Sequence, residues 1–108
     1  MPRLGTQTVG IANNGTLSGT ITLRGADQVL VATAGPLTAG TYSYQISPDG
    51  GATWMPARNA SGSALTTLVA GTVAWALPAE LLAASQVRLV AGAAEGAART
   101  FTVLSKGD

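Results

Sequence analysis

The acidic side chains are the first candidates for chemistry, because the 108-residue sequence contains no histidine and no cysteine. Its internal carboxylates are Asp27, Asp49, Glu80 and Glu95. A glycosidase needs two carboxyl groups on facing walls of a cleft, but each of these four falls in a turn, cap or loop context. A serine or threonine nucleophile would need a base, and the one lysine, Lys106, lies near the C-terminus. Since the commonest metal ligands are also missing, we expect no enzyme, no metal site and no cofactor.

The sharpest local motif is the octapeptide Ser-Pro-Asp-Gly-Gly-Ala-Thr-Trp at residues 47–54. It resembles the Asp-box, a β-hairpin turn that recurs once per blade in sialidase-type propellers. Its aspartate can accept hydrogen bonds from backbone N–H groups two or three residues later, and its glycines permit unusual φ values. The motif occurs once in a chain too short for a propeller, so we predict a structural turn rather than a catalytic or calcium-binding site. The turn residues are Ser47, Asp49, Gly50, Gly51, Thr53 and Trp54, with the tryptophan packed back over the turn.

The five aromatic residues offer a second kind of chemistry, because exposed rings can stack on sugars. They are Tyr42, Tyr44, Trp54, Trp75 and Phe101. All five fall within runs of alternating apolar and polar residues. Such placement is typical of side chains that pack in or beside a core, so we predict core packing over a sugar-binding platform.

Charge is scarce throughout the chain. Six basic and five acidic residues make up 10% of the positions and give a net charge of +1, whereas ordinary globular proteins are about 25% charged. Near-neutral, charge-poor surfaces tend to associate. The dispersed basic residues do not form the stripe that nucleic-acid binding requires, and no apolar run is long enough for a membrane helix. We therefore expect a protein partner, with no nucleic acid, no membrane and no small-molecule ligand.

Short alternating runs broken by Gly, Pro and Asn predict β-strands along most of the chain. We expect strands at residues 6–12, 16–23, 28–33, 41–46, 54–58, 65–69, 72–77, 86–91 and 99–104. Residues 78–84 are the single helical candidate, with proline at the start and a glutamate in the first turn. This pattern predicts an all-β single sandwich, jelly-roll or Ig-like. The expected divisions are an N-terminal arm (1–5), the sandwich domain (6–104) and a C-terminal tail (105–108).

Three connections carry more specific expectations. Asn-Asn-Gly at residues 13–15 tolerates positive φ, so we predict that it pairs the first two strands as a hairpin. The two runs on either side of Gly71 form either a hairpin or one bent strand. The Ala/Gly-rich segment after residue 91 is a flexible connection or, alternatively, a place where a neighbouring subunit approaches closely.

Several of these features recur in a recognisable order. A Tyr-x-Tyr-x-Ile strand at residues 42–46 leads into the turn motif, a Leu-Pro-Ala-Glu-Leu-Leu-Ala segment at 77–83 precedes a Val-Arg-Leu strand, and Ala-Arg-Thr-Phe-Thr-Val lies at 98–103. Over residues 15–104 the chain resembles small structural proteins from the virion-assembly region of tailed bacteriophages and related phage-like particles. The resemblance implies a β-sandwich or jelly-roll module and no catalytic residue.

For such a protein the resemblance implies head decoration: the module binds the head shell and stabilises it by bridging capsomers. Its partners would be the major capsid protein and further copies of itself, in a homo-oligomer such as a trimer. It would be made in the host cytoplasm without a signal peptide and reside on the capsid surface. The interface can include an N-terminal arm, here Met1, Pro2, Arg3 and Leu4.

Other functions stay open at this point. Within the same class, the chain could be a tail or fibre-associated module, which would be present in far fewer copies per particle. A carbohydrate-binding β-sandwich that uses the aromatic residues is an alternative from another class, and a sialidase-like enzyme fragment is a third. The scarcity of charge favours assembly, because strands rich in Thr and Ala leave faces and edges suited to lie against other protein.

Overall fold

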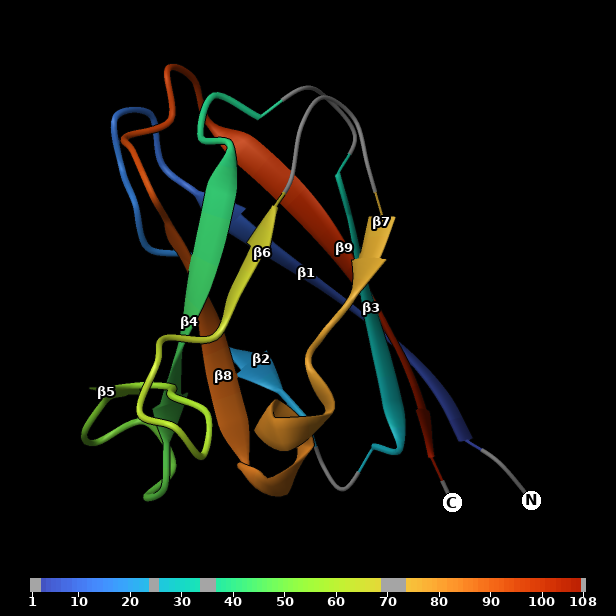
Figure 1. Ribbon diagram of the computed structural model, residues 1–108. Coiled ribbons are helices and arrows are strands. Elements are labelled where there is room, and N and C mark those ends of the chain that lie inside the picture. The colour runs from blue at the N-terminus through green and yellow to red at the C-terminus, as the bar shows by residue number, and fades with distance from the viewer. Residues whose placement is uncertain (1–2, 24–25, 34–36, 69–73, 108) are drawn as a thin grey trace.

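The computed structural model describes residues 3–23, 26–33, 37–68 and 74–107, with all of their side chains except those of Arg3 and Leu68. Its strands form two antiparallel sheets packed face to face, which confirms the predicted all-β sandwich (Figure 1). One sheet has the order β1-β9-β3-β7. The other has the order β2-β8-β4, and both β5 and β6 pair with β4. The elements are β1 (Arg3–Ile11), β2 (Ile21–Thr22), β3 (Gln28–Thr33), β4 (Thr41–Ser47), β5 (Met55–Pro56), β6 (Thr66–Leu68), β7 (Ala74–Ala76), the 3₁₀ helix η1 (Ala79–Ala83), β8 (Gln86–Ala91) and β9 (Arg99–Gly107).

The core lies between the sheets and follows directly from the period-2 alternation of the strands. Every second residue of β3 and β8 points inward and is buried, and the alternation continues through the first half of β4 and the middle of β9. Tyr42, Trp75 and Phe101 meet there with ring centroids 5.9–6.4 Å apart, and the Trp75 indole N–H donates to the Tyr44 hydroxyl at 3.0 Å. Core packing is thus confirmed for these four of the five aromatic residues.

The first and last strands are longer than the sequence predicted. Strand β1 begins at Arg3 and pairs residue by residue with β9, from Arg3 opposite Gly107 to Ile11 opposite Arg99. Residues 3–5, assigned to an arm, therefore continue a strand, and most of the expected C-terminal tail does the same. Met1 and Pro2 lie outside the described residues. The long ladder explains the extension, because each added pair satisfies further backbone groups.

The predicted pairing of the first two strands is wrong, although the turn between them forms as expected. Asn14 adopts a φ of 65°, and the Gly15 N–H donates to the Ala12 carbonyl at 2.8 Å. The chain then crosses to the other sheet, where β2 pairs with β8, and only an isolated bridge joins Ile11 to Ser18. The partner of β1 is β9, at the far end of the sequence, where local patterning cannot reveal it.

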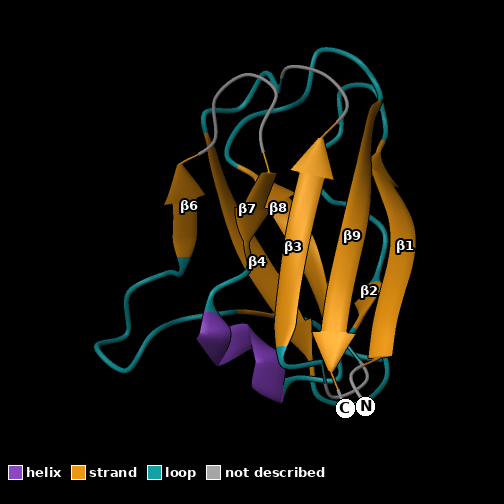
Figure 2. Ribbon diagram, turned by 90° about the vertical axis from the view of Figure 1, so that its right-hand side faces the viewer, coloured by secondary structure: helices purple, strands orange, loops and turns teal. Residues whose placement is uncertain are grey.

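The runs on either side of Gly71 also belong to different sheets. Strand β6 pairs with β4, whereas β7 pairs with β3, so neither a hairpin nor one bent strand is formed. Gly71 itself lies outside the described residues. The predicted helical turn is present as η1, which buries Leu81 and lies across one end of the sandwich (Figure 2).

Candidate assembly surface and the turns around it

The outer face of the β1-β9-β3-β7 sheet is an open surface in which side chains from neighbouring strands form rows. Residues directly opposite in an antiparallel pair share a face. One such row runs from Thr6 through Leu104 and Leu30 to Ala76, and Figure 2 looks onto the strands that carry it. We call this surface the open face. Its described side chains and glycine are Leu4, Thr6, Thr8, Gly10, Gln28, Leu30, Ala32, Ala74, Ala76, Thr100, Thr102, Leu104 and Lys106.

The open face is apolar at its centre and nearly free of charge. Leu4 is 82% exposed, Leu30 45% and Leu104 43%, and Leu4 lies diagonal to Leu104 because it is opposite Lys106. Lys106 is the one charged side chain among the residues of this face. An exposed apolar group of this kind on a small protein typically marks a contact surface.

The outer face of the second sheet also has an exposed leucine, Leu17 (43% exposed), beside Val90, but its central polar side chains bind one another. Arg88 of β8 donates through Nε to Oε1 of Gln45 on β4 at 2.6 Å. The Arg88 guanidinium also lies 4.4 Å from the centre of the Trp54 ring. The tryptophan of the turn motif therefore packs against a neighbouring strand, and we call this surface the paired face.

The turn motif at the end of β4 is held by its own side chains. The Asp49 carboxylate accepts from the Thr53 backbone N–H at 2.9 Å and from the Thr53 hydroxyl at 2.7 Å, and the Ser47 hydroxyl donates to it at 2.9 Å. Ser47 Oγ in turn accepts from the Gly51 N–H at 2.7 Å. Gly50 and Gly51 have φ values of 74° and 100°, which are costly for other residues.

These contacts leave the turn chemically self-contained. The hydrogen bonds from Thr53, and with them the one from Ser47, hold the pKa of Asp49 below its usual range. Among the described residues, no group of three or more His, Cys, Asp or Glu side chains is placed to hold a metal ion. The turn therefore positions the end of β4 and Trp54, and it brings together Ser47, Asp49, Gly51 and Thr53 as a structural unit.

A second carboxylate network, around Glu95, was not foreseen from the sequence. Glu95 lies in the Ala/Gly-rich segment between β8 and β9, and its side chain is 0% exposed. It accepts from the backbone N–H groups of Thr38 (2.7 Å) and Ala39 (2.9 Å) and from the Tyr42 hydroxyl (2.9 Å). Arg99 adds an ion pair at 2.8 Å. The lone acid in an alanine run, four residues before an arginine, was the available signal.

The network fixes the segment that contains it, which differs from the expected flexible connection. Burial alone would raise the pKa of Glu95, but the hydrogen bonds from Ala39, Thr38, Arg99 and Tyr42 lower it to about 2. Burial and the nearby carboxylate raise the pKa of the Tyr42 hydroxyl. The Glu95 backbone also pairs with the turn at residues 14–15. Three chain segments therefore meet at Glu95, whose side chain is ionised and bonded at both oxygens.

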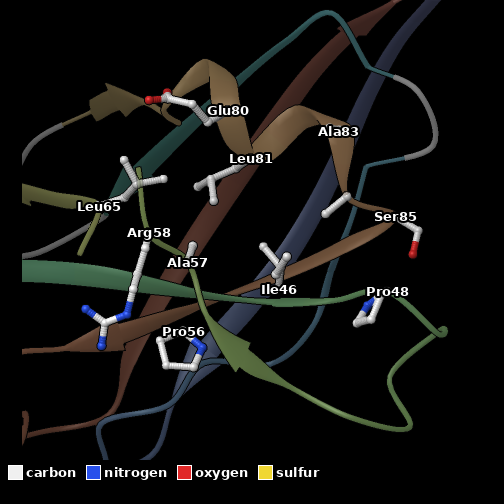
Figure 3. Close-up of a pocket in the computed structure, with 11 residues that line it drawn as sticks. Ile46, Pro48, Pro56, Ala57, Arg58, Leu65, Glu80, Leu81, Ala83 and Ser85 are labelled. Atoms are coloured by element: carbon white, nitrogen blue, oxygen red, sulfur yellow. The ribbon is translucent and has the colours of Figure 1, made fainter. Parts of the chain in front are cut away.

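A surface pocket of about 470 Å³ lies where η1 faces the end of β4 (Figure 3). Apolar side chains such as Ile46, Leu65 and Leu81 line it, and the charged ends of Arg58 and Glu80 point away from one another. Only one carboxylate is among the lining residues, so the pocket does not provide an acid–base pair. No helix in the described parts of the chain has the length and hydropathy needed to cross a membrane.

Comparison with solved structures identifies the same fold in a phage-derived protein. The crystal structure of the SPBc2 prophage-derived protein YomS aligns with a TM-score of 0.64, covering 99% of this chain and 96% of that chain at 10% sequence identity. A chain of the Bacillus endospore appendages, a family of disulfide-linked pili, aligns with a TM-score of 0.39 over 98% of this chain and 88% of that chain, at 16% identity. The YomS alignment shows a shared fold. No protein-family profile matches the sequence, and no curated protein matches it.

Proposed function

We propose that the chain is a non-enzymatic virion structural protein that decorates the head of a tailed phage or phage-like particle. In this role it binds the shell of major capsid protein through the open face and stabilises the shell by bridging capsomers. The observation that carries the proposal is the open face itself, an apolar and almost uncharged surface on a rigid sheet. A phage-derived structural neighbour and the sequence resemblance to virion proteins support the phage setting.

The chemistry of the open face favours a folded protein as the partner. Nucleic-acid binding depends on Lys and Arg contacts to phosphates, and Lys106 is the one cation among the residues of this surface. Its threonine hydroxyls can form hydrogen bonds, while Leu30 and Leu104 supply apolar area worth about 25 cal/mol per Å² when buried. Binding of this kind depends on shape more than on long-range charge, so it should change little with salt.

The carbohydrate-binding alternative has little support from the aromatic residues. Tyr42, Tyr44 and Phe101 are buried in the core. Trp75 packs against two of them, and one side of the Trp54 ring lies under Arg88. These rings therefore offer no shared platform on which a sugar could stack.

The number of copies per particle tests the proposal and separates it from a tail or fibre role. We expect purified particles to contain hundreds of copies by quantitative gel densitometry, and recombinant protein to rebind particles that have lost it. Tens of copies or fewer would instead support the tail alternative. Absence from purified particles, together with no rebinding, would contradict the proposal.

A further inference from the structure

The outer edge of β1 carries backbone groups that nothing in the described structure uses. The Gly10 carbonyl accepts from the Gly19 N–H at 3.1 Å, on the side of β1 away from β9. Backbone groups of an antiparallel strand alternate between its two sides with a period of two residues. The N–H and C=O groups of Leu4, Thr6 and Thr8 therefore also point away from β9, and they have no hydrogen-bond partner among the described residues.

The side chain of Gln7, the one described polar side chain next to this edge on the inner side of β1, does not cover it. Gln7 exchanges two hydrogen bonds with the backbone of Thr22, donating at 2.6 Å and accepting at 2.9 Å. This contact closes the space between β1 and β2 on the inner side of the sheet. In Figure 2, β1 forms one border of its sheet, with no strand beyond it.

We infer that β1 is a self-pairing edge, on which β1 of a second copy of this chain adds as an antiparallel strand. With the two-fold axis at Thr6, Thr6 lies opposite Thr6 of the second copy, and Leu4 lies opposite its Thr8. This register uses all the free groups and forms up to about six hydrogen bonds. The two sheets then continue into one another across the axis.

Three observations favour a second copy as the occupant. Residues 4–11 contain no charge and no proline, the devices that normally protect an edge strand, so two copies of β1 meet without repulsion. Leu4 is 82% exposed at this edge and lies on the same side of the sheet as the open face.

Area gives the third reason. The paired residues of the open sheet span roughly 450 Å² at standard strand spacings, whereas a specific interface takes about 800 Å² per partner. Joining two sheets edge to edge doubles the open face to roughly 900 Å². This area argument rests on the proposed function, whereas the free backbone groups and the lack of charge on β1 concern the free protein.

Single cysteines provide the sharpest test, since the natural chain has none. In the inferred register the Thr6→Cys residues of two copies lie about 5.5 Å apart at Cα, within disulfide range. Those of Thr8→Cys would be about 14 Å apart along the strands. Under mild oxidation we expect a covalent dimer of Thr6→Cys on a non-reducing gel, and at least about tenfold less of it from Thr8→Cys or from Thr102→Cys, which lies on β9.

A second pair of variants tests the edge without any cross-link. Proline at position 6 removes an N–H that does not take part in the β1-β9 ladder, so the fold should tolerate it. We expect sedimentation velocity to show a dimer for the natural chain and for Thr6→Ala, and a dissociation constant at least about tenfold weaker for Thr6→Pro. Circular dichroism checks that each variant is folded.

The results of these experiments distinguish failure of self-pairing from failure of shell binding. A natural chain that stays monomeric at high concentration, or Thr6→Cys that cross-links no better than Thr8→Cys, would overturn self-pairing in this register. Either result would leave the proposed function to stand on its own test, because rebinding to particles is measured separately, and only the enlarged two-copy contact would be lost. Conversely, a protein that pairs in solution and is absent from particles would retain this inference and lose the proposed function.

Discussion

The two outer faces of the sandwich arise from similar alternating strands but differ in what their side chains contact. On the paired face, Arg88 bonds Gln45 and stacks over Trp54, so polar groups are satisfied within the molecule. On the open face, Leu30 and Leu104 remain exposed between rows of Thr and Ala. Exposed apolar area is the part of a surface that gains free energy from a partner.

The two faces should therefore contribute to different properties: the paired face to the stability of the chain, and the open face to binding. Contacts made within the paired face contribute to folding of the chain alone, and substitutions there should change the free energy of unfolding. Leu30 and Leu104 of the open face keep over two-fifths of their surface exposed, so substitutions there should change binding more than stability.

The largest expected effect on stability comes from removing the buried carboxylate of Glu95. Glu95→Ala leaves the buried end of Arg99 and the N–H groups of Thr38 and Ala39 without their acceptor, and breaking a buried pair costs about 3–5 kcal/mol. We expect a loss of this size in the free energy of unfolding by urea titration. Glu80→Ala, at an exposed position of η1, is the matched control and should have an effect near zero.

The same carboxylate predicts how stability depends on pH. Its pKa in the folded chain is lowered from 4.5 to about 2, so its contribution is complete above pH 4.5 and is lost as the pH falls toward 2. The linked change is about 3 kcal/mol. Urea titrations between pH 7 and 2 should show this decline, and Glu95→Gln, which does not titrate, should lack that part of it. An equal decline in both proteins would contradict the assignment.

A charge placed on the open face should weaken binding without a comparable loss of stability. Leu104→Glu puts a carboxylate at the centre of the apolar row, where burial against a partner is costly. We expect particle binding to weaken about 100-fold, or about 2.7 kcal/mol, with a loss of no more than about 1 kcal/mol in the free energy of unfolding. Thr66→Glu makes the same change on the outer side of β6, opposite Ser43 of the paired face, and should bind normally. Equal losses in both variants would remove the distinction between the faces.

The smallest expected effect lies on the paired face. Trp54→Ala removes the ring under Arg88, and a cation–π contact at a partly exposed site is worth about 0.5–1 kcal/mol. We expect thermal unfolding to record a loss of about that size, with particle binding unchanged, and Trp54→Phe to recover part of it. Weaker binding at full stability would assign a docking role to the paired face instead.

Local chemistry explains why much of the fold could be predicted. Strands β3 and β8 match their expected bounds, since alternation is visible within six residues. The Asp49 turn is similarly local, because its donors lie within four residues along the chain. Local structure of this kind is determined by side chains that are close in the sequence.

Long-range contacts explain what could not be predicted. Glu95 bonds Thr38 and Ala39 across 57 and 56 positions, and β1 pairs with a strand at the opposite end of the chain. The alanines and glycines around Glu95 are typical of a flexible connection, and the acid four residues before Arg99 is the one local signal of the network. The open face could be predicted only in part, because local patterns predict its strands but not their order in the sheet.

Chemical labelling of assembled particles shows which face of the sandwich lies against the shell. A single cysteine at Leu104→Cys or Thr66→Cys is assembled onto particles, and its rate of reaction with a maleimide is compared with that of the free protein. The open-face assignment predicts that Leu104→Cys is strongly protected on the particle while Thr66→Cys reacts at its free rate. Protection of Thr66→Cys with Leu104→Cys still reactive would contradict it.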